Sequence, residues 1–128
     1  MKSILVRDAP KMIVQAEDFK AGDLYGIAWL PNSPLYPAAR RTDSMPEEER
    51  SALLFAMKVR QEAPANVETV NIPEGLYYLV SSYGVPVAWI TCEGTVHRTK
   101  LRYSTATANH TEIGVKGLQE LSQILHGR

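Results

Sequence analysis

Residues 76–101 constrain the fold of this chain more than any other segment. Three runs of β-forming residues alternate here with two short turn candidates: Leu76–Ser82, Tyr83-Gly84, Val85–Cys92, Glu93-Gly94 and Thr95–Leu101. Connections of only two residues force neighbouring strands to run antiparallel, so this segment predicts a three-stranded meander. Pro86 follows the first turn and cannot donate to a strand ladder, so we expect it at an outward-facing position or at a β-bulge.

A helix is predicted before the meander, from about Met45 to Gln61. Ser44 is a suitable N-cap, Pro46 lies in the first turn, and Glu47 completes a capping box. The apolar residues that follow predict a wide buried face on this helix: Ala52, Leu53, Phe55, Ala56, Met57 and Val59.

A second helix is predicted after the meander, from about Thr107 to Leu125, because apolar residues recur there at helical spacing. Gly114 and Gly117 each lower the helix propensity by roughly 1 kcal/mol relative to alanine. We therefore expect this helix to depend on docking, with the two glycines permitting close backbone approach.

The remaining segments carry weaker signals. Met12–Val14 and Leu24–Leu30 read as strands, and Lys20–Asp23 supplies turn residues for a hairpin between them. Pro31–Asp43 begins with three prolines in seven residues, which predicts a surface loop. Val67–Ile72 alternates in polarity like a half-buried strand.

Together these elements predict an α+β fold. We expect an antiparallel β-sheet, made of the meander and an N-terminal hairpin, packed with a central and a C-terminal helix. The length of 128 residues predicts a single domain over 1–128, in which 74–126 form a module of β-meander and C-terminal helix.

Composition excludes several classes of function. Fourteen basic and fourteen acidic residues balance, so net charge gives no case for nucleic acid or an anionic membrane. A single cysteine, Cys92, excludes an internal disulfide, and the three histidines lack ligand spacing, so neither a metal nor a cofactor is expected. The apolar run Ile4–Val6 is too short for a signal peptide, so we expect a cytoplasmic protein without a membrane segment.

A polar cluster at the start of the C-terminal helix is the first candidate site. It contains Ser104, Thr105, Thr107, Asn109 and His110. Such residues cap a helix by accepting hydrogen bonds from its first N–H groups, and this interpretation is favoured. The alternative is an anion or small-ligand site, or an active site, in which the same N–H groups, the hydroxyls and His110 converge.

A sheet face of the meander is the second candidate site. Two-residue turns would set Tyr78 and Arg98 on either side of Trp89, with a cation–π contact between Trp89 and Arg98. With Lys100 and Arg102 this face would suit single-stranded nucleic acid. The alternative is a buried aromatic core with a solvated basic edge, because a bulge would shift the register.

Cys92 and His97 are considered as a nucleophile and base. The same register places His97 opposite Ile90 rather than beside Cys92. A small buried hydrophobic residue is therefore the favoured interpretation of Cys92, and no catalytic residue is assigned.

Two segments, Ser82–Trp89 (SYGVPVAW) and Tyr103–His110 (YSTATANH), resemble a small family often encoded by bacteriophages and prophages, particularly those of actinobacteria. The family pattern is approximately S-Y-G-T-P-I-A-W, a variable hairpin, and Y-S-x-T-T-x-x-H before a short helix. This chain departs from it at Val85, at Ala106-Thr107 and at Thr111, where glutamine often follows the histidine. The family has no established activity, so the resemblance implies a phage origin and no catalytic assignment.

We therefore expect a small phage-derived accessory protein that binds a host or phage protein, in the host cytoplasm if phage-encoded. An unpaired meander edge is also compatible with a homodimer. The alternatives are a nucleic-acid-binding module on the sheet face and an anion binder or enzyme at the start of the C-terminal helix.

Overall fold

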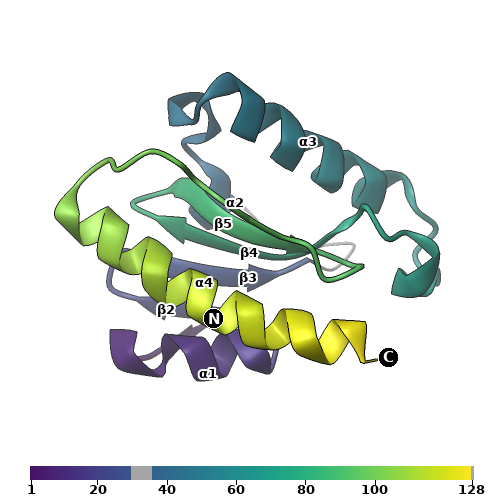
Figure 1. The fold of residues 1–128 in the computed structure, drawn as a ribbon, viewed down its shortest axis with the longest axis horizontal. Coiled ribbons are helices and arrows are strands. Elements are labelled where there is room, and N and C mark those ends of the chain that lie inside the picture. The colour runs from purple at the N-terminus through teal and green to yellow at the C-terminus, as the bar shows by residue number, and fades with distance from the viewer. Residues whose placement is uncertain (30–35, 128) are drawn as a thin grey trace.

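The chain folds around one mixed β-sheet. The computed structural model describes residues 1–29 and 36–127 (Figure 1). Within them the strands lie in sequence order: β1 Lys2–Ser3, β2 Phe19–Ala21, β3 Leu24–Ala28, β4 Leu76–Ser82, β5 Val85–Thr91 and β6 Val96–Arg98. The α+β class is confirmed. The expectation of a wholly antiparallel sheet is wrong, because β1 pairs in parallel with β2.

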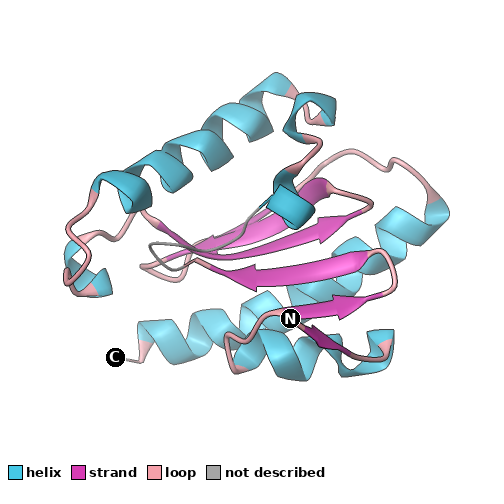
Figure 2. Cartoon of the chain, turned by 180° about the vertical axis from the view of Figure 1, so that it is seen from behind, coloured by secondary structure: helices cyan, strands magenta, loops and turns pink. Residues whose placement is uncertain are grey.

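Helices cover both faces of this sheet. They are α1 Ala9–Val14, α2 Tyr36–Ala39, α3 Glu47–Glu62 and α4 Thr105–His126, with 3₁₀ turns at Val6–Asp8, Thr42–Ser44 and Thr69–Asn71. The helices α1 and α4 lie side by side on one face, and α3 lies over the other (Figures 1 and 2). None of the helices among the described residues has the length and apolar character needed to cross a membrane.

The face covered by α1 and α4 holds the larger core. Tyr78, Val80 and Ile90 from the sheet are buried there against Ile13 of α1 and Leu118 of α4. Burying such side chains contributes about 1.5–3 kcal/mol each, so this packing stabilises both helices. It also explains why α4 forms despite its two glycines.

The face covered by α2 and α3 holds a second core. Trp89 and Leu79 are buried here, with Leu53 and Ala56 contributed by α3. The expected residue range of α3 agrees well with the structure, but the expectation that this helix buries a wide face is wrong. Phe55 is 50% exposed, because the helix presents only one narrow stripe to the sheet.

The meander is confirmed, but its register differs from the expected one. Tyr83 and Gly84 both have positive φ, 53° and 80°, as a two-residue type I′ turn requires. Pro86 lies at the expected bulge, where the pairing slips between Val80 and Ser81. That slip moves Trp89 opposite Leu79 instead of Tyr78.

The second turn of the meander is longer than two residues. Thr91 donates its N–H to the carbonyl of Thr95, and Gly94 donates back to Thr91. Because of this longer connection, Trp89 pairs with His97, and Arg98 pairs with Ala88. The strand β6 also ends at Arg98, three residues before the expected Leu101.

Three other sequence expectations are wrong. Met12–Val14 lies in α1 rather than in a strand, and the N-terminal hairpin is formed by β2 and β3 instead. Val67–Ile72 contains a 3₁₀ turn. The N-cap of α3 is Pro46, without a side-chain cap from Ser44.

The surface loop expected over Pro31–Asp43 is described only in part. Its first five residues, 31–35, lie outside the described residues, as does Leu30 before them. The remainder of the segment contains α2 and the start of the 3₁₀ turn at Thr42–Ser44.

Candidate functional site

A pocket of about 370 Å³ lies between the β4–β5 turn and the start of α4. Its wall combines one guanidinium, two phenols and three hydroxyl side chains: Arg41, Ser82, Tyr83, Val85, Tyr103, Ser104 and Thr107. Among the residues that the structure describes, no carboxylate lines it. Two of these residues, Ser104 and Thr107, belong to the predicted polar cluster.

A polar network extends from Ser82 and Thr107 at the pocket wall to His110. Ser82 Oγ lies 2.8 Å from His110 Nδ1 and 3.1 Å from Thr107 Oγ1. Tyr83 stacks against His110 with ring centroids 6.1 Å apart. Burial lowers the pKa of His110, and the nearby Asp23 carboxylate opposes this shift. Burial is the larger of the two effects and favours the neutral form of the imidazole.

Arg41 is tied to the β4–β5 turn by its backbone. Its N–H donates to the carbonyl of Gly84 at 2.9 Å, and its guanidinium reaches the carbonyl of Tyr83 and the hydroxyl of Ser44 at 3.5 Å each. Neither of the two ion pairs found among the described residues involves Arg41. Among these residues, therefore, no carboxylate lies within ion-pair distance of the Arg41 guanidinium.

At the start of α4, one backbone N–H group is capped by a side chain, and two others have no acceptor within the helix. Ser104 caps the helix, since its side chain accepts the N–H of Thr107 at 3.1 Å. The first turn contains no acidic residue. The N–H groups of Thr105 and Ala106 have no acceptor within the helix, because the first helical donors never do.

The other members of the predicted cluster lie differently. His110 reaches the pocket through Ser82, whereas Thr105 and Asn109 are exposed and do not line it. Sequence reasoning missed Arg41, Ser82 and Tyr103. Ser82 and Tyr103 open the two segments on which the family resemblance rests, which is the one signal that could have pointed to them.

The second predicted cluster is not brought together on one face. Tyr78 faces α1 and α4, whereas Trp89 faces the opposite side, and they are 0% and 1% exposed. Because they are buried, neither ring offers a surface on which a base could stack. Lys100 and Arg102 are exposed in the segment after β6.

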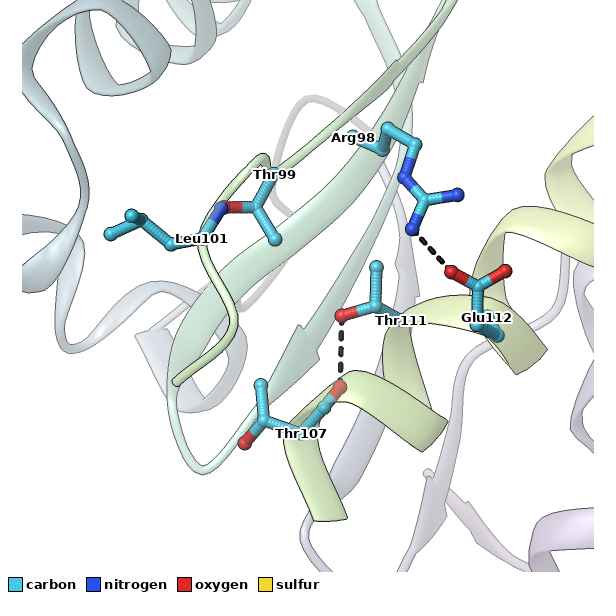
Figure 3. A network of polar contacts seen from close by, with 6 residues as sticks. All are labelled: Arg98, Thr99, Leu101, Thr107, Thr111 and Glu112. Atoms are coloured by element: carbon cyan, nitrogen blue, oxygen red, sulfur yellow. Dashed lines mark hydrogen bonds and ion pairs between the residues drawn. The ribbon is translucent and has the colours of Figure 1, made fainter. Parts of the chain in front are cut away.

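The expected contact between Arg98 and Trp89 is wrong, because the pairing register of β5 with β6 differs from the expected one. Arg98 forms an ion pair with Glu112 of α4, and Figure 3 shows the two side chains pointing toward one another. His97 takes the place beside Trp89, with ring centroids 5.2 Å apart and planes only 6° apart. Burial lowers the pKa of His97 as well.

Cys92 and His97 do not form a catalytic pair. His97 stacks on Trp89, while Cys92 is buried with its Sγ 3.4 Å from the guanidinium of Arg60. Among the described residues, no group of three or more His, Cys, Asp or Glu side chains could hold a metal ion.

Comparisons with protein-family models, with curated proteins and with solved structures found no match for this chain. The function of the pocket is therefore inferred from its own residues and geometry.

Proposed function

We propose that this protein binds a small anionic ligand, recognised through a phosphate or carboxylate group, in the pocket beside the start of α4. One observation carries the proposal: the pocket is lined by Arg41 and several hydroxyls and, within the described part of the chain, by no carboxylate. An anion that enters it meets a positive charge without having to displace a negative one.

The helix itself favours an anion at this position. The helix α4 has 22 residues, and its aligned peptide dipoles place roughly half an elementary charge of positive sign at its start. The helix α3 has three glutamates in its first turn, whereas α4 has none. The first turn of α4 therefore carries no negative side chain that would oppose an anion bound beside Ser104 and Thr107.

The hydroxyls would add hydrogen bonds of defined direction. Ser104 is occupied as the cap, and Thr107 contacts Ser82, so both lie fixed at the wall rather than moving freely. Tyr103 is also anchored, because its hydroxyl donates to the carbonyl of Ser44 at 3.3 Å. A wall whose side chains are already ordered loses little further entropy when a ligand binds.

Isothermal titration calorimetry with inorganic phosphate, acetate and adenosine monophosphate tests the proposal. Arg41→Ala should weaken binding about 10- to 100-fold, the range expected when a charge-assisted hydrogen bond of about 1.5–3 kcal/mol is lost. The matched control is Arg7→Ala, since Arg7 is exposed and does not line the pocket. Absence of binding at millimolar concentrations, or equal weakening by both variants, would contradict it.

A phage-derived accessory protein that binds a host or phage protein is the second candidate. Besides the family resemblance, it is supported by Leu54 and Phe55 of α3, which are 46% and 50% exposed. Phe55→Ser should then reduce recovery of one defined protein from host lysate, and Val70→Ser, at another exposed apolar site, should not. Nucleic-acid binding has less support, because Tyr78 and Trp89 are buried.

A further inference from the structure

We infer that Ser82 is a nucleophile activated by His110, so that this pocket hydrolyses small carboxylic esters that carry an anionic group. The inference rests on the proposed function for one part only, the placement of the anionic group by Arg41. It goes beyond that function because it assigns a reaction to the polar network at the pocket wall.

The Ser82–His110 contact has the geometry of a nucleophile and its base. Oγ and Nδ1 lie 2.8 Å apart, within the range for such a pair. When His110 carries its proton on Nε2, Nδ1 accepts the hydrogen bond from Ser82. The Ser82 hydroxyl donates to Thr107 Oγ1 at 3.1 Å in the structure, and it has to rotate toward His110 Nδ1 before the proton can be transferred.

The surroundings hold the base in place. Tyr83 stacks on the imidazole of His110, and the Asp23 carboxylate lies near enough to favour a positive charge on it. Burial has the larger effect and favours the neutral imidazole, which is the form that can accept a proton. Asp23 would stabilise the imidazolium once the proton has moved.

The β4–β5 turn holds Tyr83 beside Ser82. Tyr83 directly follows Ser82, lines the same pocket and has φ of 53° as the first residue of the type I′ turn.

The first reaction step forms an acyl-enzyme. Ser82 Oγ attacks the ester carbonyl carbon while its proton moves to His110 Nδ1, and the carbonyl electron pair moves onto the oxygen. The positive end of the α4 dipole, at the wall formed by Ser104 and Thr107, would stabilise the negative charge on this oxyanion. The intermediate then expels the alkoxide, which takes the proton from His110 and leaves as an alcohol.

The second step restores the enzyme with water. A water molecule attacks the acyl carbon and gives one proton to His110 Nδ1. The bond between carbon and Ser82 Oγ breaks, Ser82 recovers that proton, and a carboxylic acid leaves. Only 1% of Ser82 is exposed, so the substrate has to approach through the pocket that Ser82 lines.

Covalent labelling of the wild-type protein with a fluorophosphonate probe tests the nucleophile. Ser82 should displace fluoride from phosphorus, and peptide mass spectrometry should find the adduct on Ser82. Labelling should fall about 100-fold or more in His110→Gln. The matched control is Ser81→Ala, since Ser81 is the neighbouring buried serine and its hydroxyl has no hydrogen-bond partner among the described residues.

Hydrolysis of mono-4-nitrophenyl succinate, with 4-nitrophenyl butyrate as the neutral comparison, tests the reaction. Ser82→Ala should abolish turnover, and Arg41→Ala should raise KM for the anionic ester alone. No adduct on wild-type Ser82, or hydrolysis that persists in Ser82→Ala, would overturn the inference. The wild-type adduct does not depend on whether Ser82→Ala folds.

The two proposals can fail separately. Phosphate binding that depends on Arg41, together with an unlabelled Ser82, would leave the anion site standing and remove the nucleophile. An adduct on Ser82 that depends on His110, without phosphate binding, would support the nucleophile and remove the anion site.

Discussion

Gly117 of α4 lies directly against Ile13 of α1, and a Cβ atom at Gly117 would be only 2.9 Å from the Cβ of Ile13. This contact fixes how closely the two helices pack on the sheet. Gly117→Ala should gain up to about 1 kcal/mol in helix propensity but lose about 1–3 kcal/mol through overpacking. We therefore expect a net decrease in the free energy of unfolding, measured by urea denaturation.

The control for this substitution is Gly127→Ala at the end of α4, where a Cβ atom would approach only helix carbonyls, at 3.4 and 3.6 Å. It should change stability much less. A Gly117→Ala protein as stable as the wild type would show that α1 can move away without cost.

Ser104 and Thr105 should differ sharply in their contribution to stability. Ser104 accepts the N–H of Thr107 as the N-cap, whereas Thr105 is exposed. Ser104→Ala should lower the free energy of unfolding by about 1 kcal/mol. Thr105→Ala should leave it nearly unchanged, and equal losses in the two variants would contradict the assignment of the cap. Thermal and urea unfolding monitored by circular dichroism measure both.

Stability should decrease as the pH falls through the histidine range. Burial lowers the pKa of both His97 and His110 below the ordinary 6.5, so the folded protein binds fewer protons there than the unfolded chain. Their contribution is therefore complete above pH 6.5 and is lost progressively below it. Glu93 and Asp23 reduce the two shifts without reversing them.

Urea denaturation at pH 5.5 and 7.5 measures this dependence. The wild type should be less stable at pH 5.5, and the double variant His97→Gln, His110→Gln should show a smaller difference between the two values. His126→Gln, at the exposed end of α4, is the control. A wild type that is more stable at pH 5.5 would contradict the sign.

The fold could be predicted where local chemistry decides it. Tyr83-Gly84 specifies a tight turn, and the glycines of α4 indicate close packing, and both predictions hold. Met12–Val14 was predicted wrongly, because three apolar residues are too few to separate a period of 2 from one of 3.6. The packing of α1, which is mainly against α4, decides its conformation.

The candidate site was predictable only in part for a related reason. Ser104 and Thr107 stand out because they lie together at a helix start. Arg41 comes from a distant segment and carries no periodic signal, so only the folded chain places it at the pocket. The prediction that Tyr78, Trp89 and Arg98 share one face of the sheet is wrong, because one bulge at Pro86 and one longer turn each shift the register by a residue. A shift of one residue moves a side chain to the opposite face of the sheet.

Tyr78 should contribute more to stability through its hydroxyl than Tyr103 does. The Tyr78 hydroxyl donates to the carbonyl of Glu17 at 2.7 Å from a fully buried ring, and it joins β4 to the segment after α1. Burial, with Asp18 and Glu17 nearby, raises the pKa of Tyr78 far above its usual value, which favours the protonated phenol that acts as the donor.

Tyr78→Phe removes this donor without changing the packing of the ring. We expect the free energy of unfolding to fall by about 1–2 kcal/mol, because the Glu17 carbonyl loses its partner. Tyr103→Phe is the matched control, since its hydrogen bond to Ser44 is 3.3 Å long and its ring is only partly buried. Urea denaturation of the two variants should therefore give a larger loss for Tyr78→Phe, and the reverse order would show that the Glu17 carbonyl finds water instead.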